Sequence, residues 1–230
     1  MRGKIEQQKT IALEVLHKLE ITDPNCILAG GAPREWWFGK EANDLDFYVY
    51  WGDHTTCGED KRRLDLLGLN GYRLMDRNPL SELYGSIKEL RRVWEVDYKG
   101  EKVQIMVMSC PTFNCVINRF GCSVSKIWWK GKLQPTTEFL VSHHMKVNVI
   151  KDDYNAKEVY VKKMAERYPE YEEFSESAYT QIKSEFISRC KTPLWMLSNL
   201  GNKQNYKVSK DLFENELDYK SYKTLTTQSD

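Results

Sequence analysis

A short apolar run that ends in two glycines constrains the fold of this chain more than any other feature. The run Cys26–Ala29 is wholly apolar and predicts a buried strand, and Gly30-Gly31 follows it directly. Pro33 suits the first turn of a helix, so the glycines should lie at a strand-to-helix junction. Backbone N–H groups at such a junction favour a phosphate, and glycine lets the backbone approach it closely. A simple turn is the alternative interpretation of the glycine pair alone.

Two aspartates mark the next predicted strand. Residues 45–50 are rich in aromatic and branched side chains, which are typical of a strand. Asp44 and Asp46 are two positions apart, so both should project from one face while Leu45 projects into the core. Paired carboxylates suit Mg²⁺ or Mn²⁺, and Mg²⁺ completes its shell with water and substrate phosphates. A solvated strand end is the alternative for an Asp-x-Asp pair alone.

The combination resembles the DNA polymerase beta-like nucleotidyltransferase superfamily. The specific part of the resemblance covers residues 28–46, where the two glycines, Arg34 one turn later and the paired aspartates follow in that order. This part is most similar to the head of tRNA CCA-adding enzymes and to small phage-encoded nucleotidyltransferases. A looser similarity to the phage group extends to about residue 175. Glu35 is a mild departure, because many relatives have Asp at that position.

The resemblance implies a fold, a reaction and a site. The fold is a mixed α/β palm with a mixed sheet, and the reaction is transfer of a nucleoside monophosphate from a nucleoside triphosphate, dependent on Mg²⁺ or Mn²⁺. Gly30 and Gly31 would face the triphosphate, and Asp44 and Asp46 would be catalytic and hold the metal. Arg34 would brace the loop or a phosphate, or form a structural salt bridge. The implied acceptor is an RNA end, such as that of tRNA, or a protein hydroxyl.

The third carboxylate of such enzymes has no clear counterpart in this sequence. Gln104 occupies the strand position where an acid is expected, and Gly121 stands where phage relatives often have Asp. If Lys99-Gly100 is a two-residue turn, Glu95 lies opposite Gln104 and would substitute as the third catalytic acid. A slip of one residue in register would move Glu95 to the other face, and a solvated position is its alternative role.

Loss of one catalytic group commonly costs several orders of magnitude in rate. A catalytically degenerate binding protein, such as a phage factor that acts on a host component, is therefore the alternative to an active transferase. The adjacent Trp128 and Trp129 fit either function. Because neighbours in a strand point to opposite faces, only one of them should be in the core, and the other would pack at an interface or stack on a base.

Periodicity predicts the remaining elements and the organisation of the chain. Helices are expected over 4–19, 34–38, 59–67, 82–92, 111–118, 156–168 and 175–190, and hairpins over 93–108 and 122–134. We expect a nucleotidyltransferase-like palm over 1–150, a helical C-terminal part over 151–200, and a polar, loosely ordered tail over 201–230.

Composition narrows the cellular setting. The net charge of +1 predicts no general affinity for polyanions, although local clusters of charge can still act. No window approaches the roughly 18 apolar residues of a membrane helix, and the N-terminus lacks the apolar core of a secretory signal. The six cysteines include no C-x-x-C pair. We therefore expect a cytoplasmic protein (in the host cytoplasm if phage-encoded), no membrane partner, no zinc site and reduced thiols.

Overall fold

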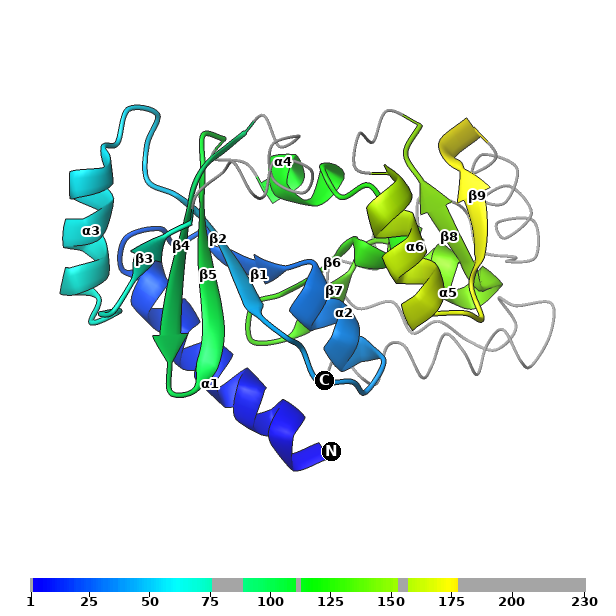
Figure 1. Cartoon of the computed structure of the whole chain (residues 1–230), viewed down its shortest axis with the longest axis horizontal. Helices are drawn as coiled ribbons and strands as arrows, with labels where there is room; N and C mark the ends of the chain where they lie inside the picture. The colour runs from blue at the N-terminus through cyan, green and yellow to red at the C-terminus, as the bar shows by residue number, and fades with distance from the viewer. Residues whose placement is uncertain (1, 76–88, 111–112, 153–156, 178–230) are drawn as a thin grey trace, which may run out of the picture. The chain divides into compact units, whose positions relative to one another are not determined.

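The computed structural model describes residues 2–75, 89–110, 113–152 and 157–177 (Figure 1). The chain divides into two compact units. The first unit comprises 1–120 together with 127–131, and the second comprises 121–126 together with 132–230. The expected division at residue 150 stays a prediction.

The first unit is built on a mixed sheet. In the described part of the chain the sheet has seven strands in the order β3-β4-β5-β2-β1-β6-β7, and all but β7 belong to the first unit. The strand β2 runs parallel to β5, whereas β1 pairs antiparallel with β2 and β6, and β4 pairs antiparallel with β3 and β5. The predicted mixed α/β class is therefore confirmed. The strands are β1 (Ile27–Ala29), β2 (Leu45–Tyr50), β3 (Arg73–Leu74), β4 (Leu90–Tyr98), β5 (Glu101–Met108), β6 (Ile127–Trp129) and β7 (Leu133–Pro135).

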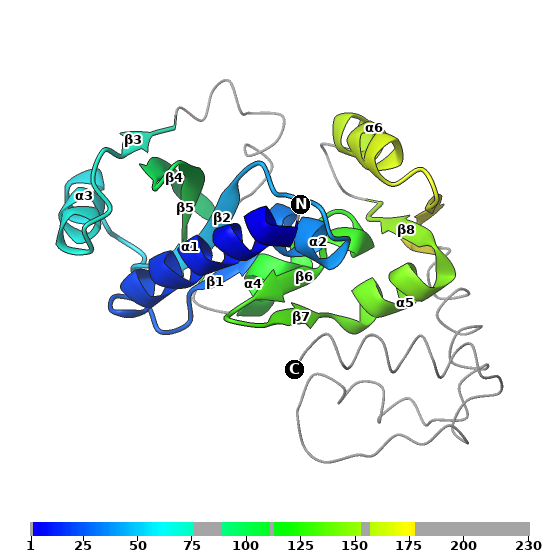
Figure 2. The same ribbon diagram turned by 90° about the horizontal axis from the view of Figure 1, so that it is seen from below.

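Helices cover both faces of this sheet. They are α1 (Arg2–Glu20), α2 (Gly31–Trp37), α3 (Cys57–Leu66) and α4 (Phe113–Asn118). Figures 1 and 2 show α1 and α4 on opposite sides of the sheet. The apolar stripe of α1, which includes Val15 and Leu19, is buried, as its periodicity predicts. On the other side, Val116 and Ile117 of α4 pack in one core cluster with Tyr48 of β2.

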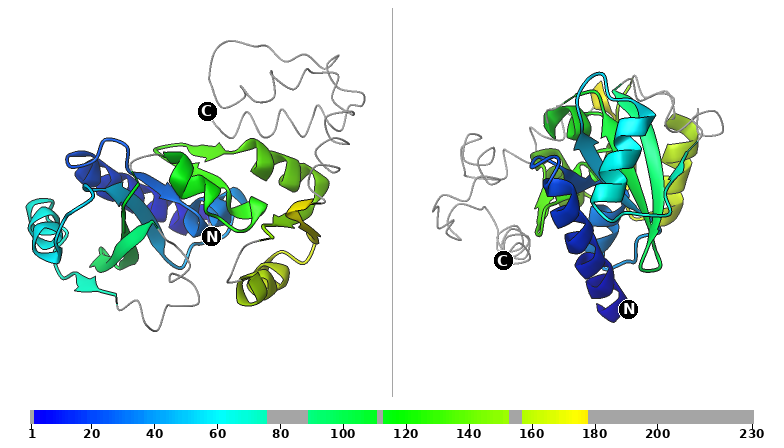
Figure 3. Two further views of the ribbon diagram at one scale, coloured as in Figure 1. Left: turned by 90° about the horizontal axis from the view of Figure 1, so that it is seen from above. Right: turned by 90° about the vertical axis from the view of Figure 1, so that its left-hand side faces the viewer.

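The helix α3 begins at a capping box. The Thr56 side chain accepts a hydrogen bond from the Glu59 backbone, and the Glu59 side chain accepts one from the Thr56 backbone. Figure 3 shows α3 beside the edge of the sheet that is formed by β3 and β4.

The second unit holds a small sheet of its own. Its strands β8 (Val147–Ile150) and β9 (Glu172–Ser175) pair in parallel. The other elements of this unit are η1 (Ser123–Ser125), α5 (Thr137–Met145) and α6 (Lys157–Arg167), besides β7. An apolar cluster of Val141, Val147 and Val149 joins α5 to β8.

Several expectations about elements need correction. Residues 90–92 lie in β4 instead of a helix, because Leu90 pairs with Met108 of β5 and is buried. The remainder of that expected helix, 82–88, lies outside the described residues. Residues 123–125 form a 3-10 turn rather than a strand, and β8, β9 and α5 had not been predicted. Most of the helix expected over 175–190 and the tail over 201–230 also lie outside the described residues.

The thiols depart from expectation at Cys110. Cys26, Cys57 and Cys122 are free, but Cys110 is disulfide-bonded. A disulfide requires Cα atoms within about 7 Å, a proximity that cysteine spacing alone did not indicate. In the part of the chain that is described, no helix has the length and apolar character needed to cross a bilayer.

Candidate functional site

A tight turn fixes the register of the strands that carry the candidate site. Lys99 and Gly100 connect β4 to β5, with φ angles of 55° and 82°. Two consecutive residues with positive φ are characteristic of the type I′ turn that closes two-residue hairpins. Glu95 consequently pairs with Gln104, which is the register predicted from the sequence.

This register aligns a row of polar residues across four neighbouring strands. Asp46 of β2 pairs with Gln104 of β5, Gln104 pairs with Glu95 of β4, and Glu95 pairs with Arg73 of β3. Paired residues on adjacent strands project from the same face, and strands are about 4.8 Å apart. The Glu95 backbone is therefore about 10 Å from that of Asp46, with the neutral amide of Gln104 between them.

The Glu95 carboxylate is bound by two cations. The Arg73 guanidinium donates from Nη2 and from Nε, which is 2.8 Å from Glu95 Oε1. The Lys102 ammonium lies 3.0 Å from Oε2, and Gln104 Nε2 donates to the same oxygen over 3.3 Å. Burial of Glu95 raises its pKa, but the bonds and charges of Lys102 and Arg73 outweigh that effect and hold the pKa below its ordinary value. The negative charge of Glu95 is thus offset by the two cations. The predicted catalytic role of Glu95 stays a prediction.

Asp44 and Asp46 are the two carboxylates predicted for the site. Asp44 immediately precedes β2, Asp46 lies within it, and both are half-buried. The intervening Leu45 is fully buried on the opposite face, as the alternation of the strand predicts. Gly31 borders the pair, because a Cβ atom placed there would lie 3.9 Å from Asp44 Oδ1. The missing side chain of Gly31 therefore leaves space beside the first carboxylate.

The donor set fits one metal ion. Mg²⁺ is commonly bound by one or two carboxylates, with water and substrate phosphates completing its octahedron. Asp44 and Asp46 provide such a pair. Within the described ranges, no three or more His, Cys, Asp and Glu side chains are grouped as metal ligands. Two carboxylates are enough protein ligands for one such ion.

Gly30 makes its contacts with other residues of the first unit. Its φ of 85° favours glycine, and its N–H donates to the Ile127 carbonyl of β6 over 3.3 Å. A Cβ atom at Gly30 would lie 2.9 Å from the ring of Phe120, so this ring covers the glycine. We therefore expect a phosphate contact at this junction to involve Gly31 more than Gly30.

Arg34 is held inside the first unit. Its side chain is buried, and its Nε and Nη2 atoms donate to Glu35 Oε1 over 3.2 and 3.0 Å. Of the two roles considered for Arg34, the structural salt bridge is the one that these contacts match. Its predicted contact with the nucleotide stays a prediction.

A second arginine contacts the strand that carries Asp46 and was not singled out from the sequence. Arg119, which follows α4, donates from Nη2 to the Tyr48 hydroxyl. Its guanidinium carbon lies 4.5 Å from the centre of the Tyr48 ring and 5.0 Å from that of Phe120. Tyr48 is two positions after Asp46 in β2 and therefore shares its face. No local spacing relates Arg119 to Tyr48, because only the tertiary fold brings them together.

The tryptophan pair follows the strand alternation as predicted. Trp129 is buried and contacts Trp36 of α2 edge to face, with 5.7 Å between the ring centres. Trp128 is half-buried and packs against the cluster that contains Tyr48. Trp129 therefore belongs to the core, and Trp128 lies on the face that carries the carboxylate pair.

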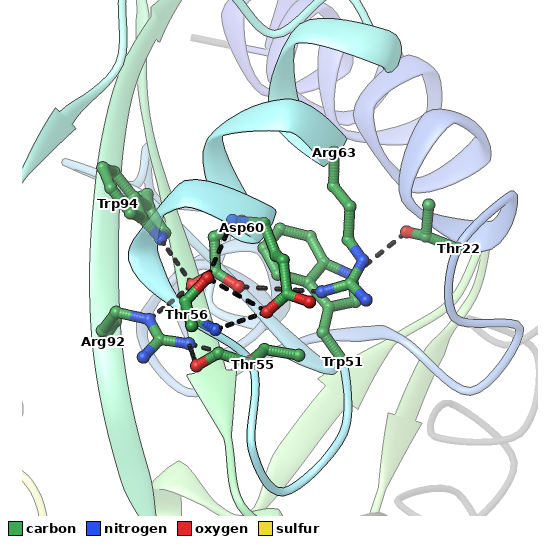
Figure 4. Close-up of polar contacts among 9 residues, drawn as sticks. Thr22, Trp51, Thr55, Thr56, Asp60, Arg63, Arg92 and Trp94 are labelled. Carbon is green, nitrogen blue, oxygen red and sulfur yellow. Dashed lines mark hydrogen bonds and ion pairs between the residues drawn. The ribbon is translucent and has the colours of Figure 1, made fainter.

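A separate polar cluster anchors α3 to β4 and supports the sheet (Figure 4). The fully buried Asp60 of α3 accepts hydrogen bonds from Arg92 Nε and from Trp94 Nε1, the latter over 3.2 Å. Arg92 Nη2 also donates to the backbone and side-chain oxygens of Thr55 over 2.7 and 2.8 Å. These contacts hold α3 against the strand that carries Glu95, so we assign the cluster a structural role.

Among the known proteins compared with this chain, similarity is found only to solved structures. No protein-family model matches the chain, and neither does any curated protein. A structure described as a tRNA-processing enzyme (apo form I) shares 16% identity with a TM-score of 0.49, over 80% of this chain and 48% of that one. A tRNA-processing enzyme in its complex 3 shares 16% identity with a TM-score of 0.43, over 71% of this chain and 43% of that one. This chain thus spans less than half the length of these enzymes.

Proposed function

We propose that the first unit binds a nucleoside triphosphate together with one Mg²⁺ or Mn²⁺ ion held by Asp44 and Asp46. The observation that carries this proposal is the placement of Asp46 in β2 and of Asp44 directly before it, with Gly31 beside the Asp44 carboxylate. Two carboxylates supply the oxygen ligands that the ion prefers, and the phosphates of the nucleotide complete its shell. The metal, when bound, offsets the charge of the phosphates. Gly31 leaves room for them to approach the backbone.

The neutral third position supports binding over transfer. Gln104 stands next to Asp46, where a third carboxylate would serve transfer, and Glu95 is engaged by Lys102 and Arg73. This arrangement favours binding of the nucleotide without rapid transfer, in a nucleotidyltransferase-like palm that acts on a further partner. A protein of this kind encoded by a phage would act on a component of the host.

Transfer is the second candidate, favoured by the carboxylate pair itself. In that reaction a hydroxyl oxygen of an RNA end, such as that of tRNA, or of a protein bonds to the α-phosphorus. The bond from the α-phosphorus to the bridging oxygen breaks, pyrophosphate leaves, and the hydroxyl proton passes to solvent. Asp44 and Asp46 would fix the metal and thereby the triphosphate in the geometry that this displacement requires.

Two measurements on the intact chain test these functions. Isothermal titration with each common nucleoside triphosphate and Mg²⁺ measures binding. Incubation with α-³²P-labelled triphosphates, total RNA and cell extract measures transfer. We expect Asp44→Asn and Asp46→Asn each to abolish Mg²⁺-dependent binding, because each removes a negatively charged ligand. The matched control, Asp152→Asn, removes the same charge at an exposed position of the second unit and should bind as wild type does.

The outcomes separate the candidates. Binding without label on any acceptor supports the binding protein, and label that disappears in both aspartate variants establishes the transferase and identifies its acceptor. If the folded wild-type chain bound no triphosphate with either ion, the proposed function would be wrong.

A further inference from the structure

We infer that Arg119, rather than Arg34, is the arginine that binds the triphosphate of the nucleotide. This inference rests on the proposed function and assigns a further residue to the same site. The two arginines differ in what they already contact. Arg34 is buried and pairs with the Glu35 carboxylate, so its charge is neutralised within the fold.

Arg119 has a different environment. It is half-buried, and in the part of the chain that the structure describes it forms no ion pair with a carboxylate. Its Nε atom is buried without a hydrogen-bond partner, whereas Nη2 donates to the Tyr48 hydroxyl. A buried donor of a charged group is costly to leave unpaired, and buried donors in proteins nearly always have an acceptor. A phosphate oxygen would supply both the acceptor and the opposite charge.

Two sets of contacts connect this guanidinium to the segments that carry the two aspartates. Through β2, Arg119 reaches Tyr48, whose side chain shares the face of Asp46 and is about 7 Å from it along the strand. Through the loop, Arg119 lies over the Phe120 ring, and that ring covers Gly30. The next residue, Gly31, borders the other aspartate of the pair, Asp44.

The two aromatic rings also orient the guanidinium. Arginine stacks on aromatic faces and keeps its N–H groups in the plane of the fork. With the Tyr48 and Phe120 rings at 4.5 and 5.0 Å, the hydrogen-bonding edge of Arg119 is fixed before a ligand arrives. A guanidinium held in this way suits bidentate binding of a phosphate, and the side chain loses little conformational freedom on binding.

The ratio of affinities for a nucleoside triphosphate and the corresponding monophosphate tests this role. Both are titrated into the full chain with Mn²⁺, and binding of Mn²⁺ alone is measured by water-proton relaxation. We expect Arg119→Gln to weaken triphosphate binding roughly tenfold to a hundredfold, because it removes charge-assisted hydrogen bonds. Monophosphate and Mn²⁺ binding should change little. The ratio should therefore fall, whereas a purely structural defect would weaken all three ligands together.

Controls make the outcome decisive. Arg62→Gln removes the same charge at an exposed position of α3 and should preserve the ratio. Arg119→Lys keeps the charge but loses the planar guanidinium, so it should give an intermediate ratio. This variant replaces Arg119→Gln as the test if the glutamine variant fails to fold. An unchanged ratio in whichever Arg119 variant folds would overturn the inference and leave the proposed function intact. Absence of triphosphate binding by wild type would instead refute the proposed function.

Discussion

Restoring a carboxylate at position 104 tests the polar row of the sheet most directly. The change Gln104→Glu replaces an amide nitrogen by an oxygen of similar size, so packing should be preserved. In the wild type, Gln104 Nε2 lies 3.3 Å from Glu95 Oε2 and donates to it. In the variant, two negative charges face each other there, and repulsion between unit charges at that distance is about 5 kcal/mol at an effective dielectric constant of 20.

The loss that we expect to measure is smaller. Lys102 lies 3.0 Å from the same Glu95 oxygen and Arg73 contacts the other, so both cations offset part of the repulsion. We expect the variant to lose about 2 kcal/mol in free energy of unfolding at pH 7. Repulsion and burial raise the folded-state pKa of the new carboxyl above its unfolded value of about 4.3. The deficit should therefore be full above that raised pKa and disappear as the pH falls toward 4.

Urea unfolding of wild type and Gln104→Glu at pH 7 and at pH 4 measures the deficit. The double variant Gln104→Glu/Glu95→Gln is the matched control, because it removes the repulsion and should recover much of the lost stability. Saturating Mg²⁺ should also recover stability, since the new carboxylate lies next to Asp46. A deficit of equal size at both pH values would refute the electrostatic reasoning, and so would a midpoint at pH 7 equal to that of wild type.

Two further variants test the frame around the site. Asp60→Asn should cost about 3 kcal/mol in free energy of unfolding, because it leaves the Arg92 charge without its carboxylate partner, and chemical unfolding would measure the loss. A loss below about 1 kcal/mol would contradict this assignment. Gly30→Ala should cost about 2 kcal/mol, because its Cβ would meet the Phe120 ring at 2.9 Å and its φ is positive. Gly39→Ala, with positive φ but no atom within 4 Å, should cost about 1 kcal/mol, and equal losses would show that the ring does not matter.

The register of the strands that carry the candidate residues could be predicted because its geometry is local. Gly100 favours positive φ, so the two-residue turn and the opposition of Glu95 to Gln104 follow from the sequence. The alternation of β2 likewise places Leu45 in the core. In both cases the determining residues lie within a few positions of each other.

What could not be predicted depends on contacts between distant segments. Residues 90–92, Leu-Arg-Arg, favour a helix by themselves, but pairing with β5 places them in a strand. The strand β9 pairs in parallel with β8. Parallel strands are not joined by a tight turn, so the sequence contains no hairpin signal that would predict β9. Arg119 reaches Tyr48 across 71 positions of sequence, and a lone arginine after a short helix gives no sign of that contact.

The parallel pairing of β2 with β5 has a consequence for the order in which the chain folds. The hairpin of β4 and β5 closes through two residues, whereas the contact of Asp46 with Gln104 requires a loop of nearly sixty residues to close. Local hairpins form in microseconds, and distant pairings form later. Asp46, one of the two proposed ion ligands, therefore meets its neutral neighbour Gln104 only near the end of folding. Metal capture during refolding, followed by Mn²⁺ relaxation, should lag behind strand formation and report completion of the sheet.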